Sequence, residues 1–189
     1  MADKLWEFTG ETKVCFGVTL RRIRAAIEFK LECGRVISKG ELGGWVEKES
    51  NLSGNAWVYG NAWVCGNAKV CGNAWVSGDA WVYGNALVCG DARVSGNAEV
   101  SGDALVFGNA EVSGKAEVFG IRDYAVFKNV WSSGRWFTYT RSDKMWKVGC
   151  FYGTGAELIA KAYEDSEKSG KCYEAIVKAQ EAIEKAMEA

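Results

Sequence analysis

The middle of the chain, from residue 55 to residue 120, repeats one six-residue pattern of apolar and polar positions. Most units read Asn or Asp, Ala, a variable residue, Val, a second variable residue and Gly, and the Val recurs every six residues from Val58 to Val118. Ala and Val lie two positions apart, so in a strand they share one face and the variable residues occupy the other. Gly and Asn or Asp suit tight corners. This period predicts a parallel β-helix filled by Ala and Val.

Three such sides complete one coil, so residues eighteen positions apart are expected to stack at a strand spacing of about 4.8 Å. The outward positions before each Val then form three columns, Trp57–Trp75–Arg93–Glu111, Trp63–Trp81–Glu99–Glu117 and Lys69–Leu87–Leu105. The outward positions after each Val form three more, Tyr59–Ser77–Ser95–Ser113, Cys65–Tyr83–Ser101–Phe119 and Cys71–Cys89–Phe107. Two faces are therefore expected to be aromatic in the early coils, and the third to be aliphatic and thiol-lined.

The region before the repeats, residues 1–40, reads as a small β element. Gly17 separates two β-prone runs, which predicts a hairpin. Arg21, Arg22 and Arg24 then alternate with apolar residues, and we interpret them as a solvated strand face rather than an anion site. A further short strand is expected around residues 36–37. The six-residue spacing already begins at Val46, so the solenoid is expected to occupy residues 41–130.

Residues 131–189 are expected to form a separate C-terminal α+β region that caps the solenoid or mediates oligomerisation. The six-residue spacing of Val118, Tyr124 and Val130 predicts one last, imperfect coil before it. Two β-prone runs on either side of Ser142 and Asp143 predict a hairpin.

Two helices are predicted after this hairpin. Thr154 and Glu157 have the spacing of a capping box, which predicts the start of the first helix. Gly170 is expected to end it. The second helix is expected from Lys171 to the end of the chain, with an apolar stripe at Ile176, Ala179, Ile183 and Met187. The predicted fold is thus mainly β, with a β-helix between a small N-terminal β element and a C-terminal β-hairpin plus two helices.

The chain resembles a known group of proteins at the entry to the solenoid, Gly43-Gly44-Trp45-Val46, and in the Gly-Asn-Ala-x-Val units that follow. These are the hexapeptide-repeat proteins found in bacteriophages, prophages and some bacterial genomes, often labelled acyltransferases or polymer-forming proteins. The resemblance implies that the solenoid is a left-handed parallel β-helix and that the protein is of phage or prophage type. It does not by itself imply a biochemical role.

The composition narrows the classes of function. The formal net charge is −1, so the chain lacks the basic character of a nucleic-acid-binding protein and we expect no nucleic-acid partner. The sequence has no apolar run long enough for a transmembrane helix and no signal-peptide core at its start, from which we expect a cytoplasmic protein, in the host cytosol if it is phage-encoded. Its seven cysteines suit a reducing compartment, and we expect Cys71 and Cys89 to be free thiols rather than a disulfide.

The absence of His argues against the enzymes known on this scaffold. The resemblance implies comparison with hexapeptide acyltransferases, which use a His as general base, and with γ-carbonic anhydrases, which bind zinc through three His residues. Acyl transfer, with Glu99 or Glu117 as the base, is kept as the alternative function. Otherwise we predict no catalytic residue, no metal and no cofactor.

The favoured hypothesis is a non-catalytic binding or assembly protein, since exposed Trp and Tyr side chains mark interaction surfaces. The candidate binding residues are Trp57, Tyr59, Trp63, Trp75, Trp81, Tyr83, Lys69 and Arg93. The candidate oligomerisation residues are Leu87, Leu105, Phe107, Ile176, Ile183 and Met187.

The expected partners are further copies of the chain, with a trimer favoured, and either a host protein or a small anionic ligand such as a nucleotide signal. Sequestering such a signal, or binding a host defence protein, would be a counter-defence function. The aromatic rings could instead cover one another or lie under the N-terminal element. Fibre formation through the solenoid ends is disfavoured by the expected caps.

Overall fold

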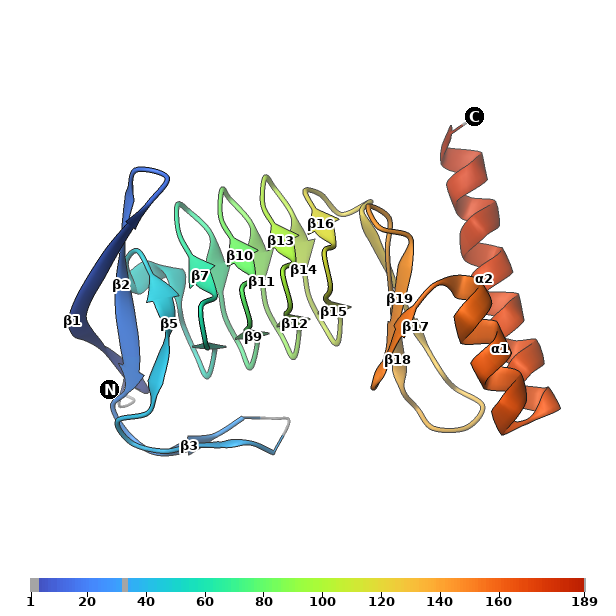
Figure 1. Ribbon diagram of the computed structural model, residues 1–189, viewed down its shortest axis with the longest axis horizontal. Coiled ribbons are helices and arrows are strands. Elements are labelled where there is room, and N and C mark those ends of the chain that lie inside the picture. Colours follow the sequence, from blue (N-terminus) through green and yellow to red (C-terminus); the bar gives the residue numbers. More distant parts are fainter. Residues whose placement is uncertain (1–3, 32–33, 189) are drawn as a thin grey trace.

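The computed structural model describes residues 4–31 and 34–188. The prediction about the very start of the chain falls partly on Met1–Asp3, and one of the seven cysteines is Cys33, so both lie partly outside the described residues. The protein is mainly β and elongated, with the solenoid in the middle, a β cap at the N-terminal end and a small sheet with two helices at the other end (Figure 1).

The repeats form a parallel β-solenoid of about four turns with three faces. The first face continues from β5 through β7, β10 and β13 to β16, the second runs from β6 through β9 and β12 to β15, and the third from β8 through β11 to β14. The solenoid strands are β5 (Leu42–Val46), β6 (Trp57–Val58), β7 (Trp63–Val64), β8 (Lys69–Val70), β9 (Trp75–Val76), β10 (Trp81–Val82), β11 (Leu87–Val88), β12 (Arg93–Val94), β13 (Glu99–Val100), β14 (Leu105–Val106), β15 (Glu111–Val112) and β16 (Glu117–Val118).

The register of these sheets confirms the predicted stacking of residues eighteen apart. Trp81 pairs with Trp63 on one side and with Glu99 on the other, for example. The repeated Ala and Val side chains fill the interior and are all buried. Because each coil supplies the same two small side chains at the same depth, the coils stack in an unshifted register. The left-handed sense of the coil stays a prediction from the resemblance.

The N-terminal cap begins with the predicted hairpin, which consists of β1 (Trp6–Cys15) and β2 (Val18–Ala25). Strand β2 pairs antiparallel with β5 and so extends the first face of the solenoid beyond its first coil. A second, smaller hairpin joins β3 (Phe29–Lys30) to β4 (Val36–Ile37) and extends along one side (Figure 1). The short 3-10 helix η1 (Glu49–Asn51) lies in the first coil.

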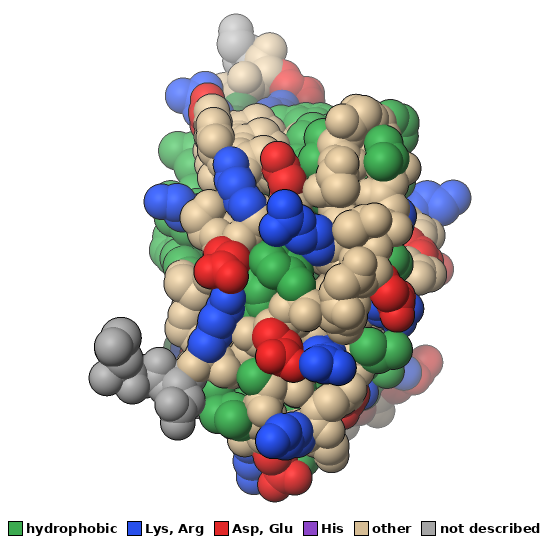
Figure 2. Space-filling model, turned by 90° about the vertical axis from the view of Figure 1, so that its left-hand side faces the viewer, with side chains coloured by type: hydrophobic (Ala, Val, Ile, Leu, Met, Phe, Trp, Pro, Cys, Tyr) green, Lys and Arg blue, Asp and Glu red, His purple; other side chains and the backbone are tan. Residues whose placement is uncertain are grey.

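Paired charges cover the outer surface of this cap. Arg22 and Arg24 form ion pairs with Glu11 and Glu7 of β1, at 3.3 Å and 2.7 Å. Figure 2 views the molecule from this end and shows Lys and Arg side chains interspersed with Asp and Glu side chains around a small hydrophobic area. Arg22 and Arg24 are therefore paired charges on a solvated strand face, and charges of this kind discourage another strand from adding to the edge.

The C-terminal sheet is antiparallel, in the order β17 (Tyr124–Lys128), β18 (Trp136–Thr140), β19 (Met145–Val148) and β20 (Phe151–Gly153). The predicted hairpin is confirmed as β18 and β19, but the predicted last coil is wrong, because Tyr124 begins a strand that pairs with β18. Each repeat unit ends in a corner Gly, but the corresponding position after Tyr124 is Val126, and Val does not tolerate the positive φ of a corner. The chain therefore continues as a longer strand.

Hydroxyl groups of this sheet cap the open end of the solenoid. The backbone N–H groups of Glu111 and Glu117 have no further coil to bond, and they donate to Thr138 Oγ1 at 2.8 Å and to Ser142 Oγ at 2.7 Å. Thr138 is buried, so this hydrogen bond is shielded from water. The C-terminal sheet thus satisfies polar groups that would otherwise form an unpaired edge.

The two helices are α1 (Gly155–Asp165) and α2 (Glu167–Glu188). The capping box of Thr154 and Glu157 is confirmed. The expectation that Gly170 ends the first helix is wrong, because Gly170 lies inside α2. It lies against the ring of Tyr163, and a Cβ there would be 2.3 Å from two ring carbons. This Gly serves close helix packing rather than helix termination.

The predicted stripe of α2 is also displaced. The buried side chains of this helix include Val177 and Gln180, whereas Ile183 and Met187 are exposed and Ile176 is half-buried. The helix packs on α1 and on the C-terminal sheet through the face that contains Val177, and this leaves part of its apolar stripe uncovered.

Candidate functional site

The first face of the solenoid carries a continuous column of large side chains. Trp45, Trp63 and Trp81 stand in register on β5, β7 and β10, and Glu99 follows on β13. The rings of Trp63 and Trp81 lie 5.1 Å apart, centroid to centroid. Tyr83, two positions after Trp81, stacks against the Trp63 ring at 6.2 Å. The strand ladder therefore builds a rigid aromatic wall from residues of successive coils.

The tip of the N-terminal hairpin lies against this wall. Its turn consists of Phe16 and Gly17, which both have positive φ, 48° and 78°. This is the backbone of the tight hairpin turns that match strand twist, and it is an unusual conformation for Phe. The Phe16 ring lies 6.2 Å from the Trp63 ring and 5.8 Å from the Trp81 ring, yet 79% of the Phe16 residue is exposed. The hairpin thus holds an aromatic ring beside the wall without burying it.

A groove of about 280 Å³ lies where the hairpin tip meets the wall. We call it the aromatic groove, and its lining is Cys15, Phe16, Val18, Trp63, Cys65, Trp81 and Tyr83. The Tyr83 hydroxyl donates a hydrogen bond to Glu99, and this bond is the main reason that the pKa of Tyr83 is raised. Burial raises the pKa of the Cys65 thiol to about 11. The lining contains no Lys, Arg, Asp or Glu side chain, and it suits an apolar or aromatic group.

Three of the predicted binding residues, Trp63, Trp81 and Tyr83, meet in this groove. Trp57 does not contribute to any surface, because it is completely buried beneath Phe29 of the small hairpin, with ring centroids 5.4 Å apart. The alternative that some rings lie under the N-terminal element therefore applies to Trp57.

The remaining predicted binding residues lie on other faces. Trp75 is half-buried on the second face, and the Arg35 guanidinium lies 4.3 Å from the centre of the Tyr59 ring. Lys69 is exposed on the third face, and Arg93 lies on the second face, where it pairs with Glu111 at 3.4 Å. The structure therefore does not bring these two cations to the aromatic groove, where they would be needed to bind a phosphate.

The predicted oligomerisation residues form two separate sets. Leu87 and Leu105 are half-buried on the third face, and Phe107 is exposed beside them. The helical set, which includes Ile183 and Met187, lies on α2 at the far end of the molecule (Figure 1).

The neighbouring thiols of Cys71 and Cys89 are free, as predicted.

Sequence reasoning missed the contribution of the hairpin tip to the site. Cys15, Phe16 and Val18 all lie in the run that predicted a hairpin, but their position against Trp63 depends on how β2 pairs with β5. The available signal was a large aromatic residue directly before the turn Gly17, where a polar residue is usual.

Comparison with known proteins supports the repeat fold. Residues 68–84 match the family model described as the YdcK beta solenoid repeat. This segment contains β8, β9 and β10, and thus includes Trp81 of the aromatic groove. No curated protein matches the chain. The match covers a small part of the chain, and it supports a β-solenoid repeat protein without indicating what that protein binds.

Two general features of the described residues bear on the class of function. Among them, no three His, Cys, Asp or Glu side chains are grouped so as to hold a metal ion. None of the helices in residues 4–31 and 34–188 has the length and apolar character required to cross a membrane.

Proposed function

We propose that this protein is a non-catalytic binding protein whose aromatic groove holds an apolar side chain of a partner protein. The observation that carries the proposal is the exposed Phe16 ring, held by a hairpin turn beside Trp63 and Trp81. Aromatic residues that line a preformed hollow are the usual centres of binding energy in protein interfaces. The resemblance to phage-type proteins suggests a host protein as the partner.

A protein partner fits this surface better than an anionic small molecule. The groove lining has no Lys or Arg, and Lys69 and Arg93 lie on other faces. Lys13 lies 4.4 Å from the centre of the Trp45 ring and adds a polar rim. An apolar centre with a polar rim is the usual anatomy of a protein interface.

The same scaffold suggests self-association as a second proposal. On the third face, Leu87 and Leu105 stand in register and Phe107 lies beside them, and neither the N-terminal hairpin nor the C-terminal sheet covers these apolar residues completely. Side-by-side packing of three solenoids through these apolar residues would bury them and give the trimer. Native mass spectrometry tests this proposal, and a monomer for the unmodified chain that stays a monomer at high concentration would refute it.

Site-specific crosslinking tests the principal proposal. We would place the photoreactive residue p-benzoylphenylalanine at position 16 and, as a matched control, at position 130, where Val130 is also apolar and exposed but lies in the C-terminal part of the chain. A partner protein should crosslink from position 16 and not from position 130. The same set of proteins from both positions, or no protein from position 16, would contradict the proposal.

The captured partner must then bind the purified protein through the groove. Replacing Trp81 by Ala removes one wall of the groove, and a hot-spot residue of this kind should weaken binding by about 30-fold, equivalent to about 2 kcal/mol. Trp136→Ala is the control, because Trp136 is also partly exposed but belongs to the C-terminal sheet. Equal affinity of the Trp81→Ala variant and the unmodified protein would refute the groove as the binding site.

A further inference from the structure

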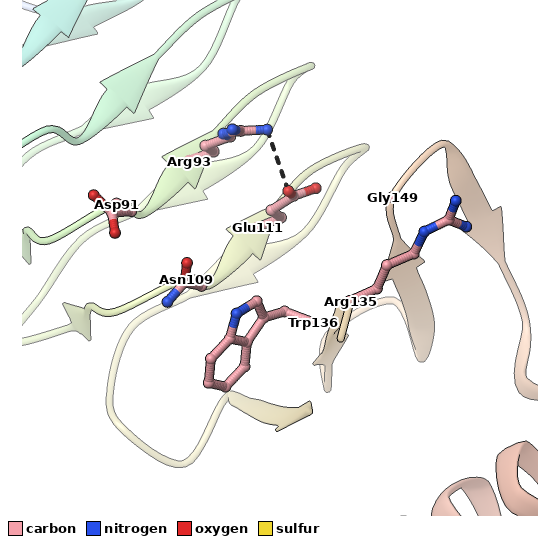
Figure 3. A pocket seen from close by; sticks show the side chains of 7 residues that line it. All are labelled: Asp91, Arg93, Asn109, Glu111, Arg135, Trp136 and Gly149. Carbon is pink, nitrogen blue, oxygen red and sulfur yellow. Dashed lines mark hydrogen bonds and ion pairs between the residues drawn. The ribbon is translucent and has the colours of Figure 1, made fainter. Parts of the chain in front are cut away.

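A second cleft lies between the last coils of the solenoid and the C-terminal sheet. It has a volume of about 340 Å³ and lies against the second face, whereas the aromatic groove lies against the first. Its lining includes Asp91, Arg93, Asn109 and Glu111 from the solenoid and Arg135 and Trp136 from the C-terminal region, and the Trp136 and Arg135 side chains point in opposite directions (Figure 3). We call it the junction cleft. We propose that the junction cleft binds a neutral sugar ring of a glycan.

The first argument is the balance of charge. Asp91 and Glu111 bring two carboxylates to the cleft, and Arg93 and Arg135 bring two guanidinium groups, so the lining has no formal net charge. Arg93 Nη1 lies 3.4 Å from Glu111 Oε1, which ties one positive group to one negative group. A phosphate would meet two carboxylates, and a cation would meet two guanidinium groups. A neutral polar ligand avoids both repulsions.

The second argument is the hydrogen-bonding capacity of the lining. Carboxylates accept hydrogen bonds, guanidinium groups donate them, and the Asn109 amide does both. Asp91 Oδ1 already accepts a bond from Asn73 Nδ2 at 3.0 Å, which holds this carboxylate in place at the corner of its coil. A sugar hydroxyl is both donor and acceptor, so adjacent hydroxyls can match such a mixed lining group by group.

The third argument is the flat apolar surface of Trp136. This residue is 37% exposed, and its indole lies below Asn109 and Glu111 (Figure 3), with Lys128 Nζ 5.2 Å from the ring centre. The face of an indole ring is electron-rich and attracts polarised C–H groups. A sugar ring carries such C–H groups on its faces and hydroxyls at its edge, so it can stack on Trp136 while its hydroxyls reach the polar lining.

The sheet registers make this arrangement rigid. Arg93 and Glu111 are paired neighbours on β12 and β15, and Thr138 of the Trp136 strand accepts the Glu111 N–H at 2.8 Å. This bond fixes the strand that carries Trp136 against the coil that carries Glu111. A binding site of this kind needs little ordering when the ligand arrives.

Titration with neutral tetrasaccharides tests the proposal. Cellotetraose, maltotetraose and chitotetraose would be screened against the full chain by saturation-transfer NMR, and any binder would be quantified by calorimetry. At least one should bind, and Trp136→Ala should weaken its binding at least tenfold, whereas Trp136→Phe should retain a large part of the affinity. Failure of all three sugars to bind at millimolar concentration would overturn the proposal, as would unchanged binding by Trp136→Ala.

Two further comparisons locate and classify the site. Asn109→Ala should weaken sugar binding several-fold, whereas Asn97→Ala should not, because Asn97 occupies the equivalent corner position outside the cleft. Glucose 6-phosphate should bind no better than glucose, and clearly tighter binding of the phosphorylated sugar would refute the charge argument. Trp81→Ala should leave sugar binding unchanged, which separates this proposal from the one about the aromatic groove.

Discussion

The close stacking of corner glycines gives a sharp prediction about what holds the solenoid together. Gly78 has a φ of +72°, and a Cβ built on it would lie 2.8 Å from the backbone oxygen of Gly96 in the next coil. Gly108 has a similar φ of +66°, but no atom lies within 4 Å of such a Cβ, because no further coil follows. Both positions share the left-handed conformation, and only Gly78 adds a close contact with a neighbouring coil.

Substitution by Ala separates these two effects. Left-handed backbone costs Ala about 1–2 kcal/mol, and the lower entropy of the unfolded chain offsets about 0.4–1 kcal/mol of this. Gly108→Ala should therefore reduce the free energy of unfolding by about 0.5–1 kcal/mol. At Gly78 the neighbouring backbone must also move, and overpacking of this kind costs a further 1–3 kcal/mol or so. Gly78→Ala should thus reduce the free energy of unfolding by about 1.5–4 kcal/mol.

Urea denaturation followed by tryptophan fluorescence and circular dichroism measures both variants. Gly108→Asn provides a control, because Asn tolerates positive φ better than Ala and should be less destabilising at this position. Equal losses for Gly78→Ala and Gly108→Ala would refute the reasoning, since they would show that backbone strain alone, and not contact between coils, determines the cost.

Three other predictions concern the caps and the groove. Gly170→Ala should destabilise the protein by about 1–3 kcal/mol because the added Cβ would press on Tyr163. In a Tyr163→Ala background the same change should stabilise the protein by up to about 1 kcal/mol, because Ala favours a helix more than Gly does. A change in thermal stability of the same sign in both backgrounds would contradict this explanation. Thr138→Val removes the hydroxyl that accepts a hydrogen bond from the Glu111 N–H of the last coil at 2.8 Å. The free energy of unfolding should fall by about 1–3 kcal/mol, and amide hydrogen exchange in that coil should become faster. Unchanged exchange would show that the cap is unimportant. Burial raises the pKa of the Cys65 thiol to about 11, so Cys65 should react with iodoacetamide at pH 8 much more slowly than the exposed Cys150 and should become more reactive as the pH approaches 11. Mass spectrometry measures both rates, and equal rates at pH 8 would refute the burial of Cys65.

The sequence by itself determined the solenoid. The period of six sets which side chains point inward, and three sides per coil set which residues stack, so the columns that begin at Trp57, Trp63 and Lys69 could be listed without coordinates. Local signals also sufficed for the turn at Gly17 and for the capping box at Thr154, because both depend on residues a few positions apart.

Only the tertiary structure decided what the ends of the solenoid do. Tyr124 keeps the six-residue spacing, yet it belongs to the C-terminal sheet because pairing with β18 is available to a strand without a corner Gly. In the sequence, Gly170 is typical of a helix end, but in the structure it lies inside α2, where the ring of Tyr163 from α1 leaves no room for a Cβ.

The candidate site follows the same division. The aromatic columns are a property of the repeat, but whether each ring is buried depends on elements far away in the sequence. Phe29 covers Trp57, while Phe16 leaves a groove beside Trp63. The repeat places a side chain on a face through local backbone geometry, whereas its exposure is the outcome of packing between distant segments, which no local pattern records.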